Sequence, residues 1–308
     1  MEVYPRNLTE LEKCFSTEES CRDYLFGLRW PDGYRCPRCG QGEAWRMQGG
    51  LFRCKSCDYK CSITSGTIFE RTRKPLVIWF RAIWWVCTQK SGASAKAIQR
   101  ILELGSYETA WAWMHKLRRA MIRPGRDQLS GTVEMDETFI GSEKPGKRGR
   151  GATGKVLVGI AVEDKGKKGL GRIRLGVLPD ASAKSLTAFA KERIELGSAL
   201  RSDGWLGYEG MVAAGYRKEV AKKTELKLAH LVVSLLKRWL LGTHQGAVSH
   251  EHLAYYLDEY TFRFNRRASV HRGKLFYRLL QNAMQIEPVT YGQIARSVPG
   301  RGRRKHNM

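Results

Sequence analysis

Residues 132–140 read TVEMDETFI, a stretch that alternates like a β-strand but carries a carboxylate at its centre. Val133, Met135 and Phe139 can point to one face of such a strand, because successive side chains alternate between its two faces. Burying the charge of Asp136 costs free energy unless a positive group pairs with it. A divalent cation held over DNA phosphates would be such a partner. The stretch therefore predicts a sheet with a metal-dependent site for phosphodiester cleavage or transfer.

A second aspartate, Asp203, lies in the stretch LRSDGW at residues 200–205. This short strand ends in a glycine turn, which is a place where a functional carboxylate can emerge from a sheet. An aspartate at a strand end more often caps a turn, so either aspartate alone is weak evidence. The helix that follows them makes the two aspartates together stronger evidence for a site.

That helix is predicted over residues 225–242, and most of its circumference is apolar. A narrow polar stripe remains, formed by Lys227, His230, Ser234 and Lys237. His230 and Lys237 are seven residues apart and nearly eclipse after two turns. A mostly apolar helix with one basic stripe that carries an imidazole suits a site that binds metal and DNA. A solvated surface stripe is the alternative.

The chain is strongly basic: it has 308 residues, of which 54 are Lys or Arg and 30 are Asp or Glu, a net charge of +24. An imbalance this large usually marks a polyanionic partner, so we expect nucleic acid rather than a membrane surface. The longest apolar run, residues 76–87, is interrupted by Arg81 and is far shorter than the roughly 20 residues that span a bilayer. The N-terminus lacks the pattern of a secretory signal, and we expect a cytoplasmic, nucleoid-associated protein with reduced thiols.

The pattern of apolar residues divides the chain into five regions. We predict a helical lead-in over 1–30, a cysteine module over 31–70, a helical region over 71–125, a larger domain over 130–285 and a basic tail over 286–308. Strands of the larger domain are predicted at 131–140, 155–163, 171–178, 199–203 and 217–221. Its helices are predicted at 182–196, 225–242 and 250–264.

Four cysteines form two pairs, Cys36 with Cys39 and Cys54 with Cys57. Each pair, spaced by two residues, can grip one side of a tetrahedral ion, so the pairs together predict a structural Zn²⁺ site. Gly40 supplies the left-handed backbone that such a turn often needs. The remaining four cysteines have no partner at ligand spacing, and we interpret them as small apolar residues. A closed four-cysteine site has no open position for a substrate, which indicates a structural role.

Two helices joined by a turn at Gly105 are predicted between residues 94 and 121, which fits a helix-turn-helix. The second helix would bring Lys116, Arg118 and Arg119 to phosphates, while short polar side chains near its N-terminus would reach base edges. An ordinary amphipathic helix with a solvated basic face is the alternative.

Several longer stretches resemble one family. VEMDETFIG at 133–141 is similar to its first aspartate motif and SDG at 202–204 to its second. SLLKRWLLGTHQG at 234–246 and YLDEYTFRFNRR at 256–267 complete the match. The chain thus resembles an ISXO-like (Merlin-related) insertion-sequence transposase of the DDE class. The cysteine pairs, followed by TSGT at 64–67 and RTRKPL at 71–76, resemble the N-terminal module of that family.

The resemblance implies a multi-domain α+β protein, in which a zinc ribbon and a helix-turn-helix precede a ribonuclease-H-like α/β domain. Asp136 would lie on the first strand of that domain and Asp203 on the fourth, and both would bind two catalytic Mg²⁺ or Mn²⁺ ions. His230 would supply the third ligand, at a position where the family more often has Glu or Asn. Neutral imidazole can ligate a divalent ion, and we expect it to shift the preference toward manganese. Lys237 would contact the phosphate near the scissile bond.

The activity implied by the resemblance is that of a DNA transposase, with metal-dependent strand cleavage and strand transfer. Its partner would be double-stranded DNA, both the terminal inverted repeats of an element and the target, and we expect a homodimer or higher homo-oligomer. DNA contacts are also expected from a basic loop that carries Lys144, Lys147, Arg148 and Arg150. A catalytically inactive relative, or a regulator that binds DNA through the zinc ribbon and helix-turn-helix, is the alternative.

Overall fold

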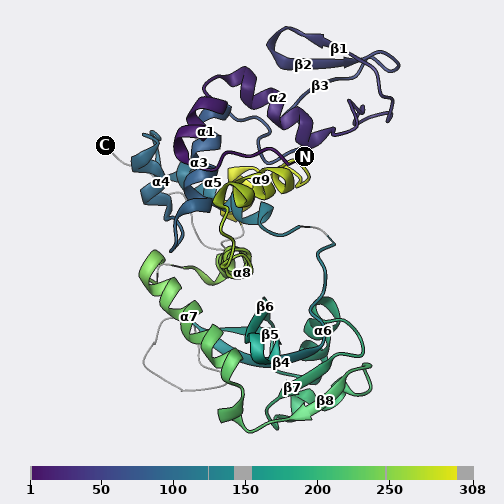
Figure 1. Ribbon diagram of the computed structural model, residues 1–308, viewed down its shortest axis with the longest axis vertical. Coiled ribbons are helices and arrows are strands. Elements are labelled where there is room, and N and C mark those ends of the chain that lie inside the picture. The colour runs from purple at the N-terminus through teal and green to yellow at the C-terminus, as the bar shows by residue number, and fades with distance from the viewer. Residues whose placement is uncertain (1, 124, 142–154, 247, 297–308) are drawn as a thin grey trace. The chain divides into compact units, whose positions relative to one another are not determined.

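The computed structural model describes residues 2–123, 125–141, 155–246 and 248–296. The chain divides into two compact units (Figure 1). One unit is formed by Met1–Arg123 together with Ser269–Met308, and the other by Pro124–Ala268. Within the described residues, no helix is long and apolar enough to cross a membrane.

The first unit begins with two helices, α1 (Leu8–Cys14) and α2 (Glu18–Arg29), which together make up the predicted lead-in. A new helix begins at Glu18 because Thr17 and Ser20 form a capping box, in which the Ser20 N–H donates to Thr17 Oγ1 at 3.1 Å. The cysteine module follows as a three-stranded antiparallel sheet in the order β1-β2-β3. Its elements are β1 (Ala44–Met47), η1 (Gln48–Gly50), β2 (Leu51–Cys54) and β3 (Lys60–Ser62).

The core of the first unit is helical. Its helices are α3 (Leu76–Thr88), α4 (Ala95–Ile101), α5 (Tyr107–Ala120), α9 (Arg272–Ala283) and α10 (Tyr291–Arg296). α9 was not predicted from the sequence, and its residues were assigned to the larger domain. In the structure, α9 packs against α3 and α5. Phe276 on α9 is fully buried and places its ring 5.7 Å from Phe80 and 5.8 Å from Trp84 on α3. Residues 272–283 therefore complete a core that is otherwise formed by residues before 124.

The second unit is built on a mixed five-stranded sheet with the order β6-β5-β4-β7-β8. Its strands are β4 (Thr132–Ile140), β5 (Val156–Asp164), β6 (Leu170–Leu178), β7 (Ala199–Ser202) and β8 (Arg217–Val220). β4, β5 and β6 pair antiparallel, whereas β7 pairs in parallel with both β4 and β8. All five predicted strands are present, and the arrangement is consistent with the predicted ribonuclease-H-like domain.

Helices cover both faces of this sheet. Val133 and Met135 pack toward α6 (Ala183–Arg193) and η3 (Leu206–Met211), while Val158 and Ile160 pack on the opposite face. That face is covered by α7 (Lys227–His244) and α8 (Leu253–Phe264). Three short helical turns, η2 (Gly166–Lys168), η4 (Lys223–Glu225) and η5 (His250–His252), complete the unit. Both faces of the central strands are buried. Successive side chains of residues 132–140 therefore point alternately toward the core on one face of the sheet and the core on the other.

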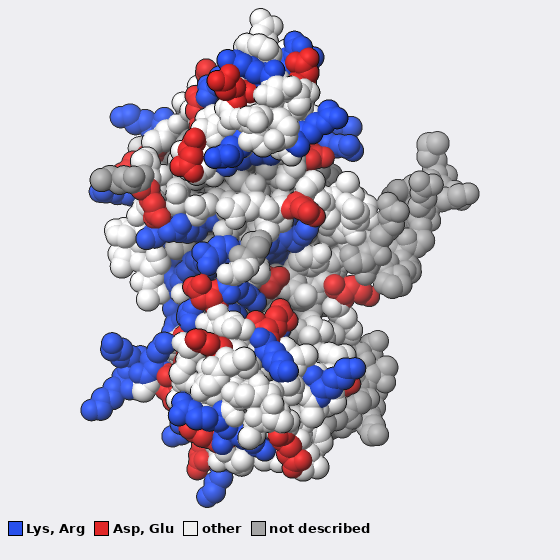
Figure 2. Space-filling view, turned by 90° about the vertical axis from the view of Figure 1, so that its right-hand side faces the viewer, with Lys and Arg blue, Asp and Glu red and all other residues white. Residues whose placement is uncertain are grey.

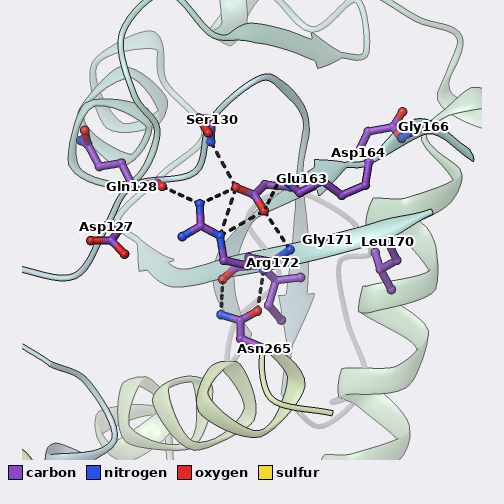
Figure 3. A network of polar contacts seen from close by, with 12 residues as sticks. Asp127, Gln128, Ser130, Glu163, Asp164, Gly166, Leu170, Gly171, Arg172 and Asn265 are labelled. Atoms are coloured by element: carbon purple, nitrogen blue, oxygen red, sulfur yellow. Dashed lines mark hydrogen bonds and ion pairs between the residues drawn. The ribbon is translucent and has the colours of Figure 1, made fainter. Parts of the chain in front are cut away.

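A buried carboxylate, Glu163, joins the segment before β4 to the β5–β6 hairpin (Figure 3). Arg172 donates to both of its oxygens, with the shortest contact 2.6 Å, and the Ser130 N–H donates to it at 3.3 Å. Arg172 also donates to the Gln128 carbonyl at 2.9 Å. At the other side of β6, the Asn265 amide forms two hydrogen bonds with the backbone of Ile173. Both chain ends of the unit are thus fastened to β6.

We expect Glu163→Gln to lower the stability of this unit by about 3 kcal/mol at neutral pH. Burial opposes ionisation of Glu163, but the hydrogen bonds and charge of Arg172 lower the pKa of its carboxyl from an ordinary 4.5 to about 2. This stabilisation is present above pH 4.5 and is lost as the pH falls toward 2, so the difference between variant and wild type should shrink over that interval. Hydrogen exchange of β5 and β6 amides under increasing urea would measure it. Glu219→Gln, in a half-exposed pair with Arg201, is the control and should cost less than about 1 kcal/mol.

Candidate functional site

Of the two aspartates singled out in the sequence, Asp136 lies on β4 and Asp203 directly follows the neighbouring strand β7. β4 and β7 pair in parallel with Glu134 opposite Arg201. The same register carried two residues further brings Asp136 level with Asp203, just past the end of β7. Because side chains alternate along a strand, Asp136 shares the sheet face of Glu134, which is the face covered by α7, and the charge of Asp203 acts on it.

His230 meets the first of these aspartates. Its Nε2 lies 3.5 Å from Asp136 Oδ2. The helix that carries His230 is positioned by Glu134, whose Oε2 accepts hydrogen bonds from the N–H groups of Leu228 and Ala229, each at 2.9 Å. These N–H groups have no partner inside the helix, and a carboxylate also suits the positive end of the helix dipole. Glu134 therefore connects the strand of Asp136 to the helix of His230.

The carboxyl of Asp136 is 8% exposed and lies among other acids. Burial raises its pKa, the Glu137 N–H that it accepts at 2.8 Å and His230 lower it, and the charges of Glu137 and Asp203 raise it, with a net increase. A cation would offset both burial and repulsion. Carboxylate oxygens with one imidazole suit Mg²⁺ or Mn²⁺, so the donors fit such an ion.

A tyrosine that was not predicted from the sequence stabilises the same region. Tyr208, 1% exposed on η3, donates to Glu137 Oε2 at 2.6 Å. Glu137 follows Asp136, and η3 begins three residues after Asp203, whose Oδ1 accepts the Trp205 N–H at 3.1 Å. Burial and the adjacent acids raise the pKa of Tyr208 well above its usual range, so it remains a proton donor. The hydrogen bond thus ties the strand of one aspartate to the segment after the other.

The polar stripe on α7 is only partly as predicted. Lys237 is exposed and lies roughly 10 Å along the helix from His230. Leu231 was counted among the apolar residues that cover the helix, but it is 46% exposed. The buried side of α7 is narrower, because only the side with Val232 and Leu236 faces the sheet.

The four paired cysteines converge on one point. Their sulfur atoms all lie within 4.8 Å of one another, and within the described residues no other group of three or more His, Cys, Asp or Glu side chains is this compact. Both turns end in a left-handed residue, Gly40 with φ 76° and Asp58 with φ 56°. Burial opposes ionisation of Cys36, but backbone N–H groups and the neighbouring thiols outweigh it and lower its pKa to about 6. The Gln41 N–H favours the Cys39 thiolate, yet the adjacent thiols raise the pKa of Cys39 to about 12. A cation is needed for all four to ionise together.

The predicted DNA-binding residues of α5 do not form a solvated face. Arg118 is 2% exposed, and Lys116 and Arg119 are half-buried. The reason is that α5 is a central helix: Trp113 stacks on Trp79 of α3 with ring centroids 3.6 Å apart, and α9 packs beside it. Arg118 is therefore not presented to a partner, and the helix-turn-helix prediction is not confirmed. The exposed part of α5 is its first turn, where Tyr107 is 46% exposed.

The remaining predicted DNA contacts, Lys144, Lys147, Arg148 and Arg150, lie outside the described residues. Figure 2 shows Lys and Arg side chains interspersed with Asp and Glu side chains over the displayed face. The excess positive charge is thus not gathered into one patch on this face.

Two known families match the parts of the chain that carry the aspartates and the cysteine cluster. Residues 128–265 match the family described as the ISXO2-like transposase domain, and residues 16–60 match the transposase zinc-ribbon domain. Residues 128–265 are therefore an ISXO2-like transposase domain, and a transposase zinc ribbon precedes it. A relative from Halobacterium salinarum, described as an uncharacterized protein in transposable element ISH50, is 25% identical over 279 residues, which are 82% of this chain and 92% of the relative. The predicted resemblance is confirmed, and the cysteine cluster belongs to a zinc ribbon, which supports a structural Zn²⁺.

Among solved structures, the chain is similar to one from the simian T-cell lymphotropic virus intasome in complex with PP2A regulatory subunit B56 gamma. The identity is 11%, the coverage is 58% of this chain and 70% of that chain, and the TM-score is 0.32. A TM-score this low supports no inference about partners. The transposase domain of this chain lies wholly inside the second unit.

We expect Cys39→Ser to lose the zinc ion and to lower the melting temperature of the first unit, because a structural zinc contributes directly to folding free energy. Zinc content by atomic absorption and thermal unfolding would measure both effects. Cys14→Ser is the matched control, since Cys14 is exposed and lies outside the cluster. Retention of one zinc per chain by Cys39→Ser would contradict the assignment.

We expect Asp136→Asn to raise the melting temperature of zinc-loaded protein without added Mg²⁺ or Mn²⁺. The substitution removes a buried charge whose ionisation is opposed by burial and by Glu137 and Asp203. Differential scanning calorimetry at constant neutral pH would show the increase. Added Mg²⁺ should stabilise the wild type and not the variant, and equal stabilisation of both would argue against a cation at this position.

Proposed function

We propose that this protein is a DNA transposase that binds the ends of its insertion sequence and catalyses metal-dependent strand cleavage and strand transfer. One observation carries the proposal: His230 lies 3.5 Å from Asp136 inside a transposase domain, and Asp203 directly follows β7, the strand that pairs in parallel with the strand of Asp136. These three side chains come from distant parts of the sequence. Their proximity in the fold supports a shared chemical task.

Asp136, Asp203 and His230 would hold two Mg²⁺ or Mn²⁺ ions. Such ions, when bound, polarise a phosphodiester and make bound water more acidic. Glu134 keeps His230 directed at Asp136 by fixing the first turn of α7. Tyr208 keeps the segment after Asp203 fastened to β4 through Glu137. Lys237 would contact a phosphate further along the same helix.

The proposed substrate is double-stranded DNA, first the terminal inverted repeats of the element and then the target. The net charge of +24 supports a polyanionic substrate. A homodimer or higher homo-oligomer is part of the proposal, because an element has two ends to be cut and joined. Lys116, Arg119 and the loop with Lys144, Lys147, Arg148 and Arg150 remain proposed DNA contacts. Action on chromosomal DNA would place the protein at the nucleoid.

A DNA-binding protein without catalytic activity is the second candidate. Two observations favour it: the third position holds His230 in place of a carboxylate, and the atoms of Asp136, Asp203 and His230 are not gathered as tightly as the four cysteine sulfurs. Such a protein would bind the same DNA through its first unit and regulate transposition.

The test is nicking of plasmid DNA that carries the sequences flanking the protein's own gene. We expect Mg²⁺-dependent nicking by the wild type and its loss in Asp136→Asn and Asp203→Asn, by more than the about 10–100-fold that loss of an outer-sphere partner typically costs. DNA affinity without Mg²⁺ should be nearly unchanged. His230→Ala should also lose nicking, whereas His230→Glu should retain it.

His250→Ala is the control, because His250 is exposed on η5, away from the aspartates in the sequence, and should nick normally. Nicking by Asp136→Asn at the wild-type rate would overturn the assignment of the site. Absence of nicking by the wild type, with DNA binding intact, would favour the non-catalytic candidate.

A further inference from the structure

A groove of about 470 Å³ lies between the zinc ribbon and the turn that precedes α3. Its lining includes Arg73 and Lys74 from the turn, Arg22 from α2, and Gly49 and Gly50 from the ribbon. Arg73 and Lys74 belong to the stretch RTRKPL, to which neither candidate site assigns a task. The groove is therefore a separate feature of the first unit.

The turn that carries the two cations is held firmly. Thr72 Oγ1 accepts a hydrogen bond from the Trp79 indole N–H at 2.8 Å and contacts the backbone of Lys74 on both its N–H and its carbonyl. Pro75 follows with φ −55° and begins α3. Ordering of the turn before binding lowers the entropy cost of association.

A third cation, Arg22, lines the same groove and is held in place. The side chain of Arg22 crosses Gly50, where a Cβ atom would lie 3.1 Å from Arg22 Cδ, and Gly50 has φ 75°. A larger residue at position 50 would displace this arginine. Glu18 lies 3.7 Å from Arg22, but its other oxygen accepts the Leu76 N–H at 2.7 Å. The one acid that lines the groove is thus shared between an arginine and the start of a helix.

The charge of this groove is not compensated. Arg73 and Lys74 are exposed, and neither forms an ion pair with an acid in the described part of the chain. The adjoining groove, which shares Arg22, is balanced by contrast, since Glu19 and Asp23 line it together with Arg46. Two exposed cations on an ordered turn, with a third lining the same groove, suit an extended polyanion.

We infer that this groove binds the phosphate backbone of duplex DNA. The inference rests on the proposed function, since it names a surface through which a transposase would hold its DNA. Lys and Arg neutralise phosphates without reading sequence, so the groove positions the ribbon on the duplex independently of the terminal repeats.

The experiment is fluorescence anisotropy of full-length, zinc-loaded protein with a labelled duplex of arbitrary sequence, over a series of KCl concentrations without Mg²⁺. Each lost phosphate contact reduces the slope of log K against log salt by about 0.9. We expect Arg73→Ala with Lys74→Ala to reduce it by about 1.8 and to weaken binding at low salt. The charge-conserving pair Arg73→Lys with Lys74→Arg should keep the wild-type slope, which a purely structural role of the turn would not require.

Lys90→Ala is the matched control for Lys74→Ala. Both remove one exposed lysine, but Lys90 lies beyond the opposite end of α3, roughly 20 Å away. Lys74→Ala should lower the slope by about 0.9 and Lys90→Ala should leave it unchanged. Equal slopes for wild type and the double alanine variant, with wild-type binding intact, would overturn the groove and leave the proposed catalysis standing. A wild type that binds no duplex at all would overturn both.

Discussion

Glu134 controls the geometry on which the candidate site depends. Its carboxylate accepts two N–H groups at the start of α7, and it stands two residues before Asp136 on the same face of β4. The distance between strand and helix is thereby set within one turn of His230. Without this contact, the first turn of α7 would have two N–H groups without a partner, one of them buried. A carboxylate with a structural task thus places one with a chemical task.

Much of the second unit could be predicted from the sequence because both of its physical signals are local. Alternation in 132–140 and the apolar run near 156–163 each identify a strand without knowledge of its neighbours. The meeting of Asp136 with His230 could be expected only through the family resemblance. The role of Glu134 was hidden, because an acid within a strand has the same appearance whether it binds a cation or caps a distant helix. Tyr208 was missed for a similar reason, since its partner is separated from it by 71 residues.

The first unit was predicted less well, and the reason is also physical. Basic residues on an amphipathic pattern indicate a solvated face only if one side of the helix stays free. α5 is surrounded, so Arg118 is buried although its spacing matched an exposed position. The cysteine pairs were predictable because a tetrahedral ion imposes its own spacing on the chain. A metal site is read from a few residues, whereas the burial of a helix depends on every element that packs around it.

The return of α9 to the first unit has a consequence for how the chain acquires its structure. Residues 124–268 are an insertion between two parts of one core, and Phe276 reaches its partners on α3 only after those residues have been made. During synthesis, the apolar surface of residues 1–123 that α9 covers therefore stays exposed until α9 has been made. The inserted unit, by contrast, can fold from one continuous stretch of chain. A fragment ending near residue 123 would keep that surface exposed permanently, and such surfaces promote aggregation. The core of the first unit is complete only when α9 has been made.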